Sequence, residues 1–181
     1  MFELDDIYPI QIPKTYLRLI KYGMALKRHE SLQGYSREHH DELLLVWKIN
    51  EGLKKKISIE RIIDYCIFHF KEMLSKHMER EEKYILSKLA DDDFDKKEIL
   101  FQHQTIKALF KKLEGSFTNK KELLSEIADK LEKHIRLEER VFFPRIQNDF
   151  SEEILKTMRP NESELKECTL WNDPFWEKVK I

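Results

Sequence analysis

Apolar residues recur at intervals of three and four through most of the chain between Ser36 and Asn148, which is the spacing of amphipathic helices. Only 4 glycines and 5 prolines interrupt the 181 residues. Hydrophobic residues make up 41% and charged residues 37%, a mixture that suits helices with an apolar stripe and a solvated outer face. No strand-like alternation of useful length is present. The pattern therefore predicts an all-α protein.

Helix start and stop signals divide this region into four long helices. Short connections make successive helices antiparallel, which predicts an up-down-up-down four-helix bundle. The acidic run at 91–95 is expected to form a turn whose last members cap the third helix, and Pro144 is expected to kink or end the fourth. The helices are expected from the N-cap Ser36 to about Gly52, from Ser58 to about Leu89, from about Lys96 to Glu114, and from about Asn119 to Gln147.

One domain with an extension at each end is expected at this length. The N-terminal extension should contain a short helix over about 14–28, which Gly34 separates from the bundle. The aromatic residues within 171–176 either dock against the bundle or mediate self-association. The expected division is an N-terminal extension at 1–35, the bundle at 36–148 and a C-terminal extension, with one short helix after Asp149, at 149–181.

Charge and cysteine content exclude several classes of function. A net charge of -1 gives no general attraction to nucleic acid or to acidic membranes. No apolar run has the length needed to span a bilayer, and the first residues lack the pattern of a secretory signal. Cys66 and Cys168 are far apart, which argues against a disulfide framework and favours a reducing, cytoplasmic setting. The oligomeric state is left open.

Two of the predicted helices carry a histidine four residues before a glutamate: His77 with Glu81, and His134 with Glu138. Residues at this spacing share one helix face, and an ordinary surface pair would explain either motif alone. The segments KHMEREEKYILSKL and KHIRLEERVFFPRI align with each other, however, and their apolar neighbours turn both pairs inward. A buried polar pair is costly unless it is satisfied, so two such pairs could satisfy each other around a cation.

The other two helices supply further histidines. His103 shares a stripe with the apolar residues three, six and seven positions later. The first helix offers adjacent candidates, and His40 is favoured because apolar residues follow it at offsets of three, four and seven, while His39 remains an alternative. Glu82 and Glu139 directly follow proposed ligands; a solvated or supporting role is preferred for them, with direct metal binding as the alternative.

The order His, HxxxE, His, HxxxE across four helices predicts four imidazoles and two carboxylates in one bundle interior. Without thiolates, this set suits iron or manganese, with zinc possible. Its size fits two ions bridged by both glutamates, with an oxo or hydroxo group to balance the charge of two ferric ions. Open coordination at such a centre suits O2, NO or peroxide, and loss of the ions would loosen the bundle, as in an iron sensor. The expected metal ligands are His40, His77, Glu81, His103, His134 and Glu138.

The motifs EHHDEL, HMEREE, FQHQTI and HIRLEERVFFP, in this order, resemble the hemerythrin-like family of histidine- and glutamate-containing cation-binding domains. The resemblance covers about 36–148 and implies an up-down four-helix bundle with a non-haem di-iron centre held by the same six residues. Oxygen-carrying members have another histidine four residues after the one on the third helix, where this chain has Lys107. The resemblance therefore does not imply reversible oxygen storage.

Three functions are compatible with these patterns. The first is a di-iron binding protein whose centre binds or senses O2, NO or iron. The second is an enzyme that consumes peroxide or nitric oxide at the same centre. The third is a helical interaction module without metal. No acid-base residue stands out beyond the proposed ligands, so the first is preferred, and whether the chain is an enzyme is left open.

Overall fold

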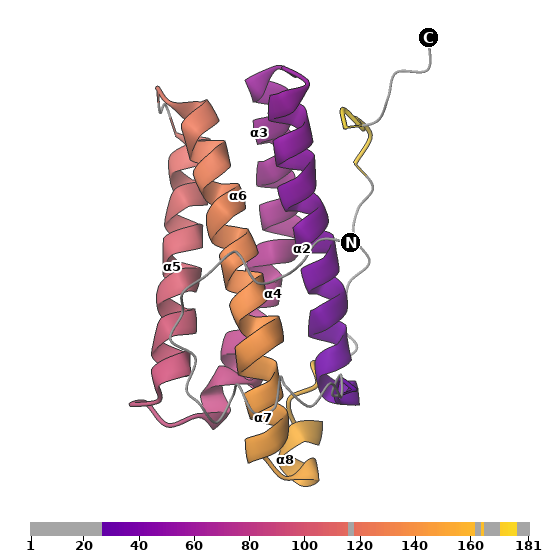
Figure 1. Cartoon of the computed structure of the whole chain (residues 1–181), viewed down its shortest axis with the longest axis vertical. Helices are drawn as coiled ribbons and strands as arrows, with labels where there is room; N and C mark the ends of the chain where they lie inside the picture. The colour runs from indigo at the N-terminus through magenta and orange to yellow at the C-terminus, as the bar shows by residue number, and fades with distance from the viewer. Residues whose placement is uncertain (1–26, 116–117, 162–163, 165–170, 177–181) are drawn as a thin grey trace, which may run out of the picture.

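The computed structural model describes residues 27–115, 118–161, 164 and 171–176, and these are helical with short connections and no strand. Figure 1 shows the long helices side by side along the longest axis of the molecule. The predicted all-α class is confirmed. Of the helix expected over 14–28, residues 14–26 lie outside the described residues, and Lys27 and Arg28 are not helical. None of the described helices combines the length and the low charge content needed to cross a membrane.

The first long helix, α2 (Glu30–Lys54), begins six residues before its predicted start at Ser36. His29 is its N-cap, and the Nδ1 atom of that ring accepts the Ser31 N–H at 3.2 Å. Gly34 lies inside the helix, so the prediction that Gly34 ends a preceding helix is wrong. The apolar stripe of α2 already includes buried residues before Ser36, and their burial outweighs the helix-breaking tendency of one glycine.

The second helical region consists of α3 (Ile59–His69), a π-helical turn η1 (Phe70–Leu74) and α4 (Ser75–Tyr84), which follow one another without a gap. A short 3-10 turn (Leu86–Lys88) ends it. The next helix, α5 (Phe94–Glu114), begins after the acidic run, and the Asp93 side chain accepts the Lys96 N–H at 3.0 Å. The expectation that the last members of the acidic run cap this helix is therefore confirmed.

The last long region consists of α6 (Lys120–Leu137), a second π-helical turn η3 (Glu138–Phe142) and α7 (Phe143–Asp149), and α8 (Glu152–Lys156) follows it. Pro144 does not end the helix, contrary to one of the two expectations for it. The Phe143 N–H bonds to the Glu138 carbonyl five residues earlier, whereas Pro144 has no N–H to give the Glu139 carbonyl. Arg28 donates to that carbonyl instead, at 3.0 Å.

The helices bury two separate apolar clusters. The larger one includes Ile49 of α2 and Phe110 of α5, and the smaller one includes Leu32 of α2 and Ile99 of α5. Along α2 and along α5 the smaller cluster comes first, whereas along α3–α4 and along α6–α7 the larger cluster comes first. Every long helical region therefore carries residues of both clusters, and the histidines of interest lie near the change from one cluster to the other.

The segment 171–176 packs against α2 and α3. Phe175 is buried in the larger cluster, and Trp176 and Trp171 lie with ring centroids 5.0 and 5.5 Å from that of Tyr65. Asp173 pairs with Arg61 of α3. Of the two roles considered for the aromatic tail, docking against the bundle is therefore the one that the described residues adopt.

Candidate metal centre

Four histidines and two glutamates meet in the interior between the two apolar clusters. Each helical region contributes one histidine, and α4 and η3 each add a glutamate. All six side chains are 0–1% exposed. Glu138 is the first residue of the π turn η3, a kind of turn that is frequent at functional sites. The residues brought together are His39, His77, Glu81, His103, His134 and Glu138.

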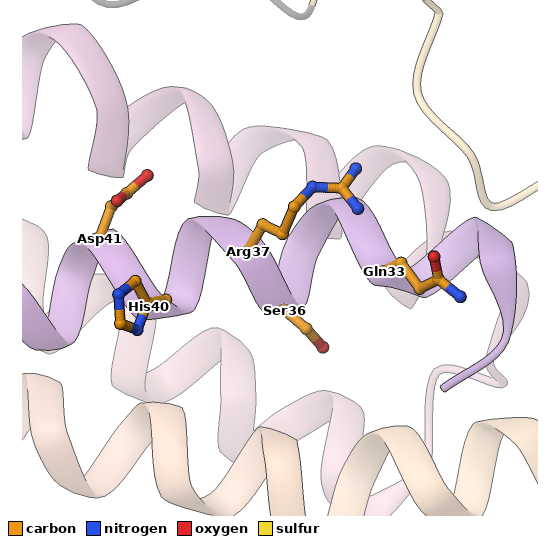
Figure 2. Close-up of a pocket in the computed structure, with 5 residues that line it drawn as sticks. All are labelled: Gln33, Ser36, Arg37, His40 and Asp41. Atoms are coloured by element: carbon orange, nitrogen blue, oxygen red, sulfur yellow. The ribbon is translucent and has the colours of Figure 1, made fainter. Parts of the chain in front are cut away.

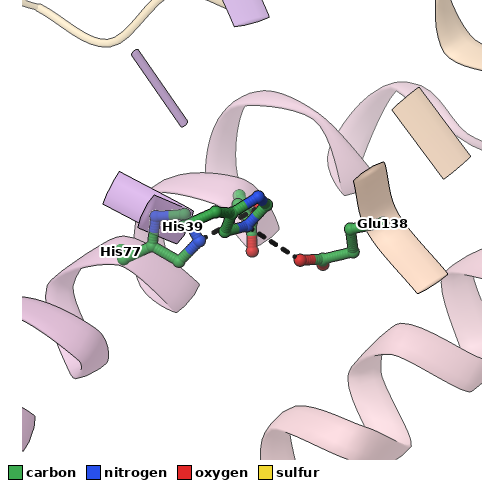
Figure 3. A group of neighbouring side chains, drawn as sticks. His39, His77 and Glu138 are labelled. Atoms are coloured by element: carbon green, nitrogen blue, oxygen red, sulfur yellow. Dashed lines mark ion pairs between the residues drawn. The ribbon is translucent and has the colours of Figure 1, made fainter. Parts of the chain in front are cut away.

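The inward ring nitrogens surround the two carboxylates. Glu81 lies 3.3 Å from His77 Nε2 and 3.4 Å from His103 Nε2. Glu138 lies 3.0 Å from His39 Nε2 and 3.4 Å from His134 Nε2. Figure 3 shows the His39 and Glu138 side chains pointing toward each other, with His77 beside them.

The six side chains form two groups that could each hold a metal ion, with donor atoms within 4.8 Å of one another in each group. One group contains His39 and His77, and the other contains His103 and His134. Glu81 and Glu138 belong to both groups, so each carboxylate can offer its oxygens to two neighbouring ions.

The atoms that face the centre have no hydrogen-bond partner among the described residues. This holds for the Nε2 atom of each of the four histidines and for both oxygens of Glu81 and of Glu138. Buried polar atoms are nearly always paired, because leaving them unpaired costs roughly 1 to 3 kcal/mol each, and more for charged groups. So many converging acceptors fit a cation, and the donor set of imidazole and carboxylate suits iron.

The outward ring nitrogens are all bound. Each histidine has a side-chain oxygen beside Nδ1, at 2.7 to 3.0 Å, which fixes the ring and directs the lone pair of Nε2 into the centre when Nδ1 carries the proton. Glu82 and Glu139 thus lie outside the ligand groups, as the sequence suggested. The pairs are His39 with Glu139, His77 with Glu38, His103 with Glu82, and His134 with Gln102.

Cationic side chains hold these outer carboxylates in turn. Arg28 contacts Glu139 at 2.7 Å, and Arg80 contacts Glu38 at 2.6 Å. Lys107 contacts Glu82 at 2.9 Å. The position at which oxygen carriers have a further histidine therefore holds a side chain that supports the centre through an outer glutamate.

The centre is electrostatically unbalanced without a cation. Burial disfavours charge on the rings, but nearby carboxylates outweigh it and raise the pKa of His77 to about 10 and that of His103 to about 9. Burial and the neighbouring Glu81 raise the pKa of the Glu138 carboxyl. Carboxylates confined in a dry interior need positive charge beside them, which either protons or metal ions can supply.

The structure corrects the choice on the first helix, because His39 and not His40 joins the centre. Figure 2 shows His40 on the flank of α2, beside Ser36 and Asp41, where it lines a surface hollow, and it is exposed. The apolar residues that favoured His40 are themselves partly exposed: Leu44 is 37% and Trp47 is 47% accessible.

A seventh buried side chain, Glu42, was missed by sequence reasoning. It is 1% exposed, both of its oxygens lack a hydrogen-bond partner, and Oε1 lies 3.8 Å from His77 Nε2. Burial raises its pKa to about 7, against the opposing effect of His77 and His39. The available signal was its position three residues after His39, on the same helix face.

Fold and centre together define a helical-bundle protein with a buried cluster of histidines and glutamates able to hold metal. The family model of the hemerythrin HHE cation binding domain matches residues 33–146, and the chain belongs to that family. The resemblance drawn from the motifs is thereby confirmed. No curated protein and no solved structure gives a significant match to the chain.

Proposed function

We propose that this chain is a non-haem di-iron protein whose centre binds or senses O2, NO or iron. The observation that carries the proposal is the pair of donor groups that share Glu81 and Glu138, with every inward nitrogen and oxygen unpaired. Two ions would each take two histidines and both glutamates. Iron supplies redox chemistry and open coordination positions for a small molecule.

The chain's own residues give this centre its properties. The two apolar clusters on either side exclude water, and the outer carboxylates hold the histidine rings in place. The alternating order of the clusters along successive helices supports an up-down-up-down arrangement, in which each helical region adds its ligands at the same level. The described helices contain no membrane-spanning candidate, and a cytoplasmic setting is part of the proposal.

The test is metal analysis of protein produced without a histidine tag in iron-supplemented medium. We expect about two irons per chain, in line with the ligand count, and an absorption spectrum that changes when O2 or NO is added. Little or no bound metal would refute the proposal. Bound iron with a spectrum indifferent to both gases would leave iron sensing as the function, which the iron dependence of thermal stability would then test.

A further inference from the structure

Glu42 is the buried carboxylate that the two donor groups leave out. It projects from α2 and comes within 3.8 Å of His77 Nε2, while neither of its oxygens has a hydrogen-bond partner. An uncompensated carboxylate in a dry interior is strongly unfavourable, so a partner must stabilise it in the working protein. The described residues around it offer no lysine or arginine contact, and its nearest ionisable neighbours belong to the metal centre.

The distance to His77 suits two ligands of one ion. Donor atoms that each lie about 2.1 Å from a metal lie roughly 3 to 4 Å from each other, depending on their angle. The separation of His77 Nε2 from Glu42 Oε1 falls in that range, as does its 3.3 Å separation from Glu81 Oε1. Among the described residues, the Nε2 atoms of His103 and His134 pair with no carboxylate other than the shared Glu81 and Glu138.

A second, independent difference distinguishes the two sides. His39 and His77 both have a glutamate at Nδ1, whereas His134 has the neutral amide of Gln102. A carboxylate partner makes a metal-bound imidazole a stronger donor than an amide does. The side of His39 and His77 therefore has a carboxylate behind both of its rings, whereas the other side has one, Glu82 behind His103.

We propose that Glu42 is a further ligand on the His39 and His77 side, so that the two metal positions are unequal. That position binds its ion more tightly and fills first, while the His103 and His134 position fills second and retains more open coordination. This inference rests on the proposed di-metal function and adds an order of loading to it.

The experiment is anaerobic titration of metal-free protein with iron(II), followed by calorimetry. Wild type should bind two ions in two steps of different affinity. Glu42→Gln, which keeps the shape but removes the charge, should weaken the tighter step at least about tenfold and affect the weaker step less. Glu51→Gln makes the same change on α2 at a position remote from the centre, and it should match wild type.

Thermal unfolding separates a ligand from a merely buried residue. Without metal, Glu42→Leu should melt at a higher temperature than wild type, because it removes an uncompensated carboxylate. With iron, the order should reverse. Unchanged steps in Glu42→Gln, or equal weakening of both, would overturn the Glu42 assignment while leaving the di-metal function standing. A wild-type protein that binds no iron would refute both.

Discussion

In each histidine of the centre, one ring nitrogen points inward and the other is hydrogen-bonded to a side-chain oxygen. Four rings oriented in this way by Glu139, Glu38, Glu82 and Gln102 require no rearrangement to accept an ion. Pre-orientation of this kind distinguishes a metal-binding site from a buried polar network that binds no ligand.

Replacing His39 and His40 in separate variants tests which of the two histidines belongs to the centre. His39→Ala should lose most of the metal of the His39 and His77 position, because it removes an inward nitrogen 3.0 Å from Glu138. His40→Ala should retain full metal content, because that ring is exposed on the flank of α2. Elemental analysis of both variants, purified in parallel, gives the measurement, and equal losses would contradict the assignment.

The adjacent histidines also show why the sequence located five of the six clustered side chains but favoured the wrong neighbour for the sixth. His77, Glu81, His134 and Glu138 were identified by an i, i+4 motif between long apolar flanks, and His103 had no rival nearby. On the first helix, apolar residues follow both His39 and His40, so the residues after Ser36 do not separate the two cleanly. The stripe that includes His39 becomes visible when the buried residues before that point are counted: Leu32 and Tyr35.

At the scale of single elements, the capping residue of α5 carries a pH-dependent contribution. Burial opposes ionisation of Asp93, but Arg145 and the Lys96 N–H outweigh it and lower the pKa of the carboxyl. A lowered pKa stabilises the fold above the pKa of the unfolded chain, and this contribution disappears as the pH falls through the folded value. Asp93→Ala should therefore cost about 1 kcal/mol near pH 7 and less near pH 3, which is below the ordinary pKa of 3.8.

Urea unfolding of metal-free protein at the two pH values measures this contribution. Asp92→Ala, a change of the same kind at an exposed neighbour that caps nothing, should have little effect at either pH. A cost for Asp93→Ala that is the same at both pH values would show that ionisation of this carboxyl plays no part.

The two glycines of α2 should respond in opposite ways to alanine. A Cβ at Gly34 would meet nothing closer than 4.0 Å, so Gly34→Ala should stabilise the helix by about 0.5 to 1 kcal/mol. A Cβ at Gly52 would lie 2.8 Å from Ile62 Cδ1 and 2.9 Å from Phe175 Cε2. Overpacking of this kind costs about 1 to 3 kcal/mol, which exceeds the gain in helix propensity.

Thermal melting of both variants tests this pair. Gly34→Ala should raise the melting temperature and Gly52→Ala should lower it. The added methyl group in Gly52→Ala should also displace Phe175 and so loosen the segment 171–176. A higher midpoint for Gly52→Ala would mean that Ile62 and Phe175 can move aside.

The π turns mark the limit of prediction at this scale. Hydrophobic periodicity predicted each long helical region that the structure describes, because buried positions repeat every three or four residues. A π turn adds one residue to a turn without changing residue type, so neither η1 nor η3 left a signal. Pro144 was the nearest clue to η3, and it suggested a kink or a helix end. The alternative partner for the Glu139 carbonyl, Arg28, lies more than a hundred residues earlier in the chain, so the local sequence does not reveal it.

At the scale of the whole molecule, the centre separates the larger apolar cluster from the smaller one. The all-α class could be predicted because apolar spacing is a local property repeated along the chain. The division of the core could not, because it depends on which positions of four helical regions lie at the same level. The centre therefore lies where two bodies of apolar contacts meet.

This division sets the expected result of metal removal. A zinc finger unfolds without its ion because it has little other core, whereas this chain has two apolar clusters that do not involve the ligands. Chelated protein should therefore keep its helical circular dichroism at room temperature. Its melting temperature should nevertheless fall, because eight or more inward atoms lose their partner, and binding at 100 times the dissociation constant contributes about 2.7 kcal/mol per site.

The measurement is thermal unfolding after chelation and again after iron is restored, with magnesium as the control cation because it favours oxygen ligands over imidazole. Iron should raise the midpoint in a concentration-dependent way and magnesium should not. His77→Ala, which removes an inward nitrogen of the His39 and His77 position, should gain clearly less from iron than wild type does. If wild type melted at one temperature under all three conditions, the inward nitrogens and oxygens would have to be satisfied by protons alone.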